Sequence, residues 1–268
     1  MKIGALIPIR LASERLPGKA LKDMCGRPVV HHLLDRVVAS RHIADPKHVV
    51  VCTTTEKFDN PLVSAVESYG CSVFRGAVDD IIKRFGDAMA ANGFDAVIQA
   101  DGDDPLSATE YMDLTMDRLL ADRTLDIVTA KGLPLGVATK SFTRAAMNKV
   151  LAAYKTEHND TGFIYFFTKS GLCRHAEIGP VSPDHVHETA RLTLDYDVDL
   201  ELFRCIFDAL YKPGEVFGLA ELVRFLNANS DLVELNRHVE AQYWQNTAEK
   251  VALQYTTNEG ALADIKFS

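Results

Sequence analysis

The chain has 268 residues, of which 47% are hydrophobic, and this share excludes an intrinsically disordered chain because it is enough to build a large buried core. With 29 Lys and Arg against 37 Asp and Glu, its formal net charge is −8 at pH 7. That balance excludes a broad basic surface for nucleic acid, although local Arg and Lys residues can still form a site for a small anion.

Short apolar runs alternate with longer amphipathic stretches through the first half of the chain. The predicted strands are Ile3–Ile9, Val49–Thr53, Cys71–Phe74, Phe94–Ala100 and Leu125–Ala130. The predicted helices are Pro28–Ala39, a helix that begins at Asn60-Pro61 and ends near Gly70, Asp79–Ala91 and Ser107–Ala121. This alternation predicts an α/β fold with a parallel sheet covered on both faces, in which ligands bind outside the carboxyl ends of the strands.

The second half of the chain is less regular. Its predicted helices are Phe142–Ala153, Val198–Tyr211 and Leu219–Leu226, and its predicted strands are Phe163–Phe167, Leu172–Ile178 and Arg191–Leu194. We expect a single domain over residues 1–268, in which residues 133–183 form an insertion that covers the site or builds a dimer interface. The expectation for this segment rests only on its irregularity.

The cysteines and apolar stretches indicate the compartment. Five scattered cysteines without a C-x-x-C pair favour reduced thiols over a disulfide framework or a zinc site. The N-terminal apolar run is too short for a signal peptide, and no stretch approaches the roughly 20 apolar residues of a membrane-spanning helix. We therefore expect a cytoplasmic protein without a membrane partner.

A basic loop follows the first predicted strand. Arg10, Arg15 and Lys19 lie there together with Ser13, in the sequence IPIRLASERLPGK of residues 7–19. Arginine presents forked donors that suit phosphate oxygens, lysine presents a compact charge, and the Pro-Gly turn can bring backbone N–H groups to a phosphate. The loop thus predicts a phosphate site, with a solvated basic loop as the alternative. It matches neither of the two common glycine-rich phosphate-binding motifs.

Two groups of aspartates follow later predicted strands. Asp101, Asp103 and Asp104 come after one strand, and Asp195 comes directly after another. Like charges this close repel each other, and a bound cation would remove that cost. Oxygen ligands without a neighbouring His or Cys suit Mg²⁺ or Mn²⁺. For the first group the alternative is an exposed turn that begins the next helix.

Other polar residues carry weaker signals. Asp197 and Asp199 are expected to cap the following helix, where negative charge meets the positive end of the helix dipole. His158 is a candidate contact for an acceptor molecule, with a surface or interface histidine as the alternative. Arg191 is a candidate partner for an acceptor carboxylate, with an ordinary strand-end arginine as the alternative. The HVHE run of residues 185–188 is a weak metal candidate, because it offers two histidines and no cysteine.

Residues 7–37, IPIRLASERLPGKALKDMCGRPVVHHLLDRV, resemble the opening of the CMP-sugar-acid synthetases. That family includes the 3-deoxy-manno-octulosonate cytidylyltransferases and the spore-coat polysaccharide cytidylyltransferases, and its specific element here is Arg-x-x-Ser-x-Arg-Leu-Pro-Gly-Lys. Residues 73–85, VFRGAVDDIIKRF, are similar to the spore-coat group in particular, and the similarity extends to about residue 200. The resemblance implies a nucleotide-diphospho-sugar transferase fold, which is a three-layer α/β/α sandwich with a mostly parallel sheet, and a homodimer.

The resemblance also implies roles for individual residues. The residues implied to contact CTP are Arg10, Ser13, Arg15, Lys19, Arg84 and Asp101. Of these, Arg84 is expected to lie near the cytosine. Those implied to hold Mg²⁺ against the α-phosphate are Asp103, within the family's Gly-Asp-x-Pro motif, and Asp195. Those expected to act in catalysis are Arg15, Lys19 and Asp103. The candidates for the acceptor are Lys140, His158 and Arg191.

We therefore predict a Mg²⁺-dependent cytidylyltransferase, with Mn²⁺ as an alternative ion, that transfers CMP from CTP to a small acidic sugar or related acceptor and releases pyrophosphate. Surface-polysaccharide or glycoconjugate biosynthesis is the expected setting. Ala138 and Lys140 depart from the family, which has acidic residues there, and Lys140 favours a more anionic acceptor. Two alternatives remain open: a metal-dependent glycosyltransferase that uses Asp101-Gly102-Asp103, and a non-catalytic nucleotide-binding relative.

Overall fold

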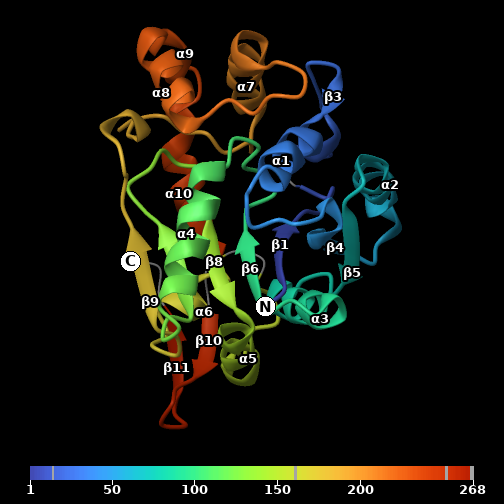
Figure 1. Ribbon diagram of the computed structural model, residues 1–268, viewed down its shortest axis with the longest axis vertical. Helices are drawn as coiled ribbons and strands as arrows, with labels where there is room; N and C mark the ends of the chain where they lie inside the picture. The colour runs from blue at the N-terminus through green and yellow to red at the C-terminus, as the bar shows by residue number, and fades with distance from the viewer. Residues whose placement is uncertain (14, 160–161, 251–252, 266–268) are drawn as a thin grey trace.

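The computed structural model describes residues 1–13, 15–159, 162–250 and 253–265. Its centre is a seven-stranded sheet with the order β5-β4-β1-β6-β8-β7-β9 (Figure 1). The strands are β1 (Ile3–Pro8), β4 (Val49–Thr54), β5 (Ser72–Gly76), β6 (Ala96–Gln99), β7 (Ile127–Ala130), β8 (Lys140–Thr143) and β9 (His175–Ile178). β8 runs antiparallel to both of its neighbours, whereas the other six strands share one direction.

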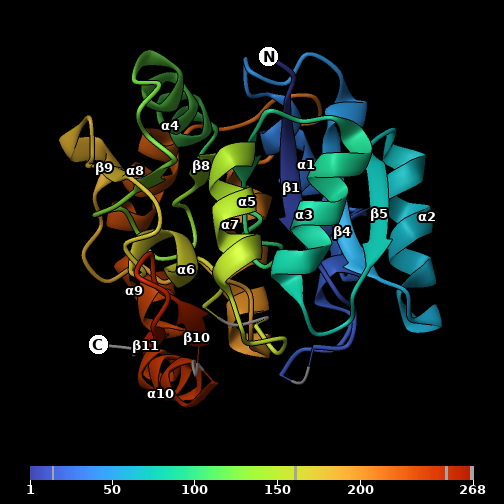
Figure 2. The same ribbon diagram turned by 90° about the horizontal axis from the view of Figure 1, so that it is seen from below.

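Helices cover both faces of the sheet, because successive strand residues point to opposite sides. The helices that do so are α1 (Val29–Val38), α2 (Asn60–Tyr69), α3 (Ile81–Asn92), α4 (Thr109–Ala121) and α5 (Arg144–Ala153). α1, α2 and α4 pack on the side of β1 that carries Ala5 and Ile7. α3 and α5 pack on the side that carries Leu6 (Figure 2). The structure thus confirms the predicted three-layer α/β/α sandwich with a mostly parallel sheet.

The C-terminal part of the chain covers the edge where the parallel strands end. It contains α7 (Asp197–Leu210), α8 (Leu219–Ala228), α9 (Ser230–Glu234), α10 (Glu240–Lys250) and the hairpin of β10 (Leu253–Thr256) with β11 (Leu262–Ile265). α7 and α8 share an apolar cluster with Leu16 of the first loop and Leu106 after β6. In Figure 1, α7, α8 and α9 lie beyond the arrowheads of β1 and β6. The loops at this edge are therefore supported from outside the sheet.

Two predictions in the second half of the chain are wrong. Phe163–Phe167 is not a strand, because Tyr165–Thr168 forms the short helix α6, in which the adjacent Phe166 and Phe167 are both buried. Arg191–Leu194 is an extended segment outside the named strands, in which Arg191 forms an isolated bridge with Leu135. The predicted helix Phe142–Ala153 is confirmed as α5, although it starts two residues later, at Arg144, because Phe142 belongs to β8 and Thr143 caps the helix. Short apolar runs fit helix and strand periods equally well, so only packing separates them.

Residues 133–183 are built into the sheet, to which they contribute β8 and β9. The segment is therefore part of the core and not an appended insertion, and its role in a dimer interface stays a prediction. The remaining predicted elements agree with the structure to within a few residues. For example, the predicted cap Asn60 is the first helical residue of α2.

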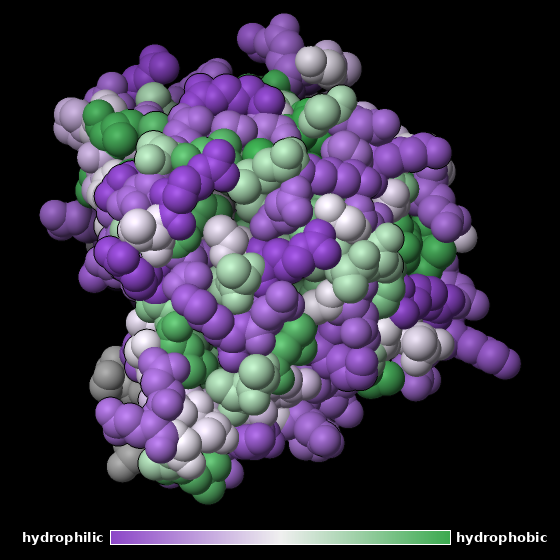
Figure 3. Space-filling model, turned by 60° about the horizontal axis from the view of Figure 1, so that its bottom comes forward, coloured by the Kyte–Doolittle hydropathy of each residue, from purple (hydrophilic) through white to green (hydrophobic). Residues whose placement is uncertain are grey.

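The molecular surface is mainly polar on the face drawn in Figure 3, where hydrophobic residues are scattered among hydrophilic ones. None of the helices in the described part of the chain is both long enough and apolar enough to span a bilayer. The apolar residues instead fill three buried clusters, two between the sheet and its helices and one beneath α7 and α8.

Candidate active site

The loop after β1 is held in shape by its own backbone and by Asp59. Gly18 N donates to Leu11 O at 3.0 Å and closes the loop into a ring, and Gly18 adopts a φ of 67°, which a residue without a Cβ reaches at little cost. Asp59 Oδ1 accepts from Leu11 N at 2.8 Å, and its other oxygen accepts from Thr53 Oγ1 at 2.8 Å. The loop is thereby fixed to the end of β4.

Lys19 lies at the centre of the site. Its Nζ donates to Asp103 Oδ2 at 3.0 Å, to Asp195 Oδ1 at 3.0 Å and to Leu194 O at 2.8 Å. Burial by itself lowers the pKa of this ammonium group, but the carboxylates of Asp103 and Asp195 outweigh that effect and hold the pKa above its usual value. Lys19 is therefore charged at any physiological pH.

Asp195 is fully buried and lies between two arginines. Arg15 Nη2 contacts its Oδ1 at 2.7 Å, and Arg191 Nη2 contacts its Oδ2 at 3.2 Å. A backbone bond of 2.8 Å from Leu194 N to Asp103 O ties this segment to the turn after β6. That bond explains why two carboxylates so distant in the sequence meet at one ammonium group.

Arg191 has a positioning role in this geometry and not the predicted contact with an acceptor. Its guanidinium is buried, forms an ion pair with Asp199 and donates to Thr193 O at 3.1 Å. Asp199 in turn accepts from the backbone N of Asp195 and of Tyr196, both at 2.8 Å, and so caps α7 as predicted. Together these contacts fix the buried carboxylate of Asp195 beside Lys19.

The turn after β6 presents three carboxylates, and each lies in a different environment. Asp101 Oδ2 contacts Lys140 Nζ at 2.5 Å, and its Oδ1 accepts from Gln99 Nε2 at 2.9 Å. Burial raises the pKa of Asp103, but Lys19 and then Arg15 bring it below its usual range. Burial and the neighbouring charges of Asp103 and Asp101 raise the pKa of Asp104 well above its usual range.

Gly102 lets this turn lie against β1. A Cβ at this position would stand 2.3 Å from Pro8 O and 2.4 Å from Ile9 Cγ1, both distances that real Cβ atoms do not show. The close approach brings the Asp101–Asp104 turn next to the basic loop. The glycine is therefore a condition for the site and not only a turn residue.

Asp103 and Asp195 fit a Mg²⁺ site of the kind completed by phosphate. Both offer hard oxygen ligands, and the ammonium group of Lys19 that they share marks a point where a cation is stabilised. Among the described residues, no cluster of three or more His, Cys, Asp or Glu residues could hold an ion unaided. An ion here would therefore take further oxygens from a ligand, and its presence stays a proposal.

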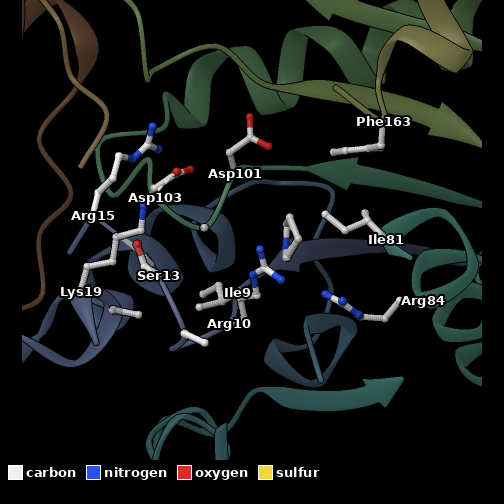
Figure 4. A pocket seen from close by; sticks show the side chains of 14 residues that line it. Ile9, Arg10, Ser13, Arg15, Lys19, Ile81, Arg84, Asp101, Asp103 and Phe163 are labelled. Carbon is white, nitrogen blue, oxygen red and sulfur yellow. Dashed lines mark hydrogen bonds and ion pairs between the residues drawn. The ribbon is translucent and has the colours of Figure 1, made fainter. Parts of the chain in front are cut away.

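Two cavities meet at this cluster. The first has a volume of about 230 Å³, and Arg15, Lys19 and Asp103 gather at one end of it with Ile81 and Arg84 at the other (Figure 4). The predicted nucleotide contacts that line it are Arg10, Ser13, Arg15, Lys19, Arg84 and Asp101. The second cavity, of about 390 Å³, shares Arg15, Asp101, Asp103 and Phe163 with the first. The structure thus brings all six predicted nucleotide contacts to one cavity.

The three predicted acceptor residues are placed differently. Lys140 lines the second cavity, whereas Arg191 is buried behind Asp195. The side chain of His158 is 82% exposed, lies 3.8 Å from Asp79 and lines neither cavity, so the surface alternative describes its position. His185 contacts the hydroxyl of Tyr111, and His187 Nδ1 accepts from Ala190 N, so these two histidines serve local structure.

Several residues of the site lacked a usable signal in the sequence. Asp59 precedes Asn60-Pro61 and could only be taken for part of a helix start, yet it anchors the basic loop. Tyr243, Trp244 and Asn246 of α10 line the second cavity, although no motif marks them. Only contacts between distant segments identify such residues.

The fold and this cluster define an α/β enzyme class that holds a phosphate-bearing ligand at the carboxyl edge of a parallel sheet. The cytidylyltransferase family model matches residues 4–180. The chain therefore belongs to the cytidylyltransferase family and is a nucleotidyltransferase that uses CTP. This membership sets aside the glycosyltransferase alternative.

The chain is also similar to individual proteins. An uncharacterized protein of Methanocaldococcus jannaschii is 28% identical over 93% of this chain and all of its own length. The 3-deoxy-manno-octulosonate cytidylyltransferase of Geobacter metallireducens is 32% identical over 49% of this chain and 50% of its own. The spore coat polysaccharide biosynthesis protein SpsF of Bacillus subtilis is 24% identical over 84% of this chain and 94% of its own.

Solved structures show the same fold. A cytidylyltransferase from Leptospira borgpetersenii superposes with a TM-score of 0.78 at 24% identity, over 87% of this chain and 97% of its own. The structure of CMP:2-keto-3-deoxy-manno-octonic acid synthetase in complex with CTP superposes with a TM-score of 0.60 at 17% identity, over 78% of this chain and 99% of its own. At these identities the likeness establishes the nucleotide-diphospho-sugar transferase fold alone.

Proposed function

We propose that the chain transfers CMP from CTP to a small acidic sugar and releases pyrophosphate, in the biosynthesis of a surface polysaccharide or glycoconjugate. The observation that carries the proposal is the contact of Lys19 with both Asp103 and Asp195 where two cavities meet. One cavity would hold the nucleotide and the other the acceptor. The names of the octulosonate and spore-coat relatives support a sugar acceptor.

The residues of the basic loop would orient the triphosphate. Arg15 and Lys19 would exchange their carboxylate partners for phosphate oxygens and stabilise the negative charge that develops on the leaving group. The acceptor hydroxyl group then attacks the α-phosphorus and loses its proton to solvent, and the bond between the α-phosphorus and the α,β-bridging oxygen breaks as pyrophosphate leaves. When bound at Asp103 and Asp195, Mg²⁺ or Mn²⁺ supplies neutralisation of phosphate charge. Positioning and electrostatics account for the catalysis, so no covalent enzyme intermediate is needed.

A pyrophosphate-release screen tests this proposal. The four nucleoside triphosphates are each combined with Mg²⁺ and a panel of acceptors that includes 3-deoxy-manno-octulosonate, N-acetylneuraminate and the neutral sugar glucose. We expect release with CTP and an acidic sugar. Asp103→Asn and Asp195→Asn should each lower kcat by about 100-fold or more, because each removes stabilisation of charge in the transition state.

Two outcomes would contradict the proposal. Near wild-type turnover in either variant would show that the substituted carboxylate has no role in the reaction. Bound CTP with no release for any acceptor would instead favour a non-catalytic relative. We also propose a cytoplasmic homodimer, on the family resemblance alone, and light scattering of the purified chain measures its oligomeric state.

A further inference from the structure

The second cavity has walls of two chemical kinds. Its lining includes the charged residues Asp101, Asp104 and Lys140 and, from α10, Tyr243 and Trp244, which we call the aromatic wall. α10 lies outside residues 4–180, which the family model matches. The aromatic wall therefore belongs to a part of the chain to which the family motifs assign nothing.

α10 is attached to the catalytic cluster. The ring centroid of Tyr243 lies 5.7 Å from the guanidinium carbon of Arg15 and 5.0 Å from that of Arg191. The ring of Tyr196 contacts the same two guanidinium groups at 5.3 and 5.5 Å. Such cation–π contacts stabilise the position of the helix relative to Arg15. The aromatic wall is thus held at a defined place beside the reacting groups.

The chemistry of both walls fits a hydroxyl-rich ring. Asp104 lines this cavity, and its buried Oδ1 has no hydrogen-bond partner among the described residues, so a hydroxyl group of a ligand that reaches this oxygen would satisfy it. The side of a sugar ring that bears C–H groups is apolar and packs well on an aromatic face. Trp244 is 40% exposed, so such a ring would remove indole surface from water.

We propose that α10 is the specificity element of the acceptor cavity, with Tyr243 and Trp244 packed against the C–H face of a sugar ring whose hydroxyls meet the Asp101–Asp104 turn. This inference rests on the proposed function, because it takes the second cavity as the acceptor site. It assigns acceptor selection to residues outside the matched family segment.

The chain provides its own reporter for this proposal, because Trp244 is its only tryptophan. CDP with Mg²⁺ fills the first cavity without turnover, and we expect it to leave Trp244 emission nearly unchanged. Adding 3-deoxy-manno-octulosonate or N-acetylneuraminate to this complex should then change the emission in a saturable way. Unchanged emission with every sugar of the panel would overturn the proposal.

Steady-state kinetics provide the second arm of the test. Trp244→Ala should raise the KM for the acceptor about 10-fold, because the variant loses the contact between the indole ring and the sugar. The KM for CTP should stay within about twofold of the wild-type value. Trp244→Phe should restore most of the loss because it keeps an aromatic face. Gln242→Ala, an exposed position of the same helix that lines neither cavity, is the matched control.

The two hypotheses fail in different ways. Absence of pyrophosphate release with all acceptors would contradict the proposed function. The emission titration would still decide whether a sugar binds against Trp244. Normal release together with an unchanged acceptor KM in Trp244→Ala would overturn the role of α10 alone. Equal increases in both KM values would also overturn it, because they would indicate a general disturbance of the site.

Discussion

Single side chains at this site act through partners from other segments. Asp59 illustrates this best, because it is buried and accepts hydrogen bonds from the loop that carries Arg10 and Arg15 as well as from Thr53 and Thr54. Burial raises the pKa of its carboxyl group, but the bonds from Thr54, Leu11 and Thr53 bring it below the usual 3.8. The charged form of Asp59 is therefore the form that stabilises the fold.

Asp59→Asn should lower the free energy of unfolding by about 1–3 kcal/mol at pH 7, because the amide leaves at least one buried donor without an acceptor. A depressed folded-state pKa provides stability that is present above pH 3.8 and is lost as the pH falls through the folded value. The difference in unfolding free energy between wild type and Asp59→Asn should therefore become smaller below pH 3.8. Urea unfolding at pH 7 and at pH 3 measures it.

The control for this experiment is Asp264→Asn, at an exposed position of β11. It should leave the unfolding free energy within about 0.5 kcal/mol of wild type at both pH values, as surface substitutions usually do. A difference between wild type and Asp59→Asn that does not change with pH would contradict the role given to the charged carboxylate.

At the scale of elements, the site depends on how closely two turns approach. The basic loop after β1 and the aspartate turn after β6 belong to adjacent parallel strands, so their ends lie side by side. Gly102 permits this approach, because a Cβ at its position would clash with Pro8 and Ile9. The contact of Lys19 with Asp103 follows from this approach.

Gly102→Ala should therefore displace the aspartate turn and lower kcat by about 100-fold or more, with a loss of about 1–3 kcal/mol in stability from overpacking. Gly179→Ala is the matched control, because its Cβ would meet nothing within 4 Å. Pyrophosphate release and thermal unfolding of both variants provide the measurement. Wild-type kcat in Gly102→Ala would show that the close approach is unnecessary.

At the scale of the whole molecule, the site joins segments that are far apart in the chain. Lys19 and Asp195 are 176 residues apart, and Tyr243 follows them from α10. A ligand that contacts these segments together can bind only the folded state. Binding should therefore stabilise the entire fold by mass action.

CTP with Mg²⁺ at about 100 times its Kd should raise the unfolding free energy by about 2.7 kcal/mol, which for a chain of this size corresponds to a melting temperature roughly 5–10 °C higher. GTP at the same concentration, and CTP after removal of the metal with EDTA, should give much smaller shifts. Differential scanning fluorimetry measures the effect. An equal shift in Asp103→Asn would argue against a metal bound at this carboxylate.

The structure also explains which predictions could be made from local patterns. The strands and helices of the first half have clear periods, and the motif from Arg10 to Lys19 is contiguous, so both were predictable before any contact was known. Phe163–Phe167 and Arg191–Leu194 were not, because burial by neighbouring segments decides their conformation. Arg191 looked like an accessible strand-end arginine only while its partner Asp199 was unknown.

The sequence by itself determined the α/β alternation, the basic loop and the carboxylates that end two later segments, because periodicity and short motifs are properties of neighbouring residues. Tertiary structure alone decided that Asp103 and Asp195 share Lys19, that Asp59 anchors the loop and that α10 walls the second cavity. These contacts join residues from distant parts of the chain, and only the packed sheet and its helices bring such residues within a few ångströms of each other.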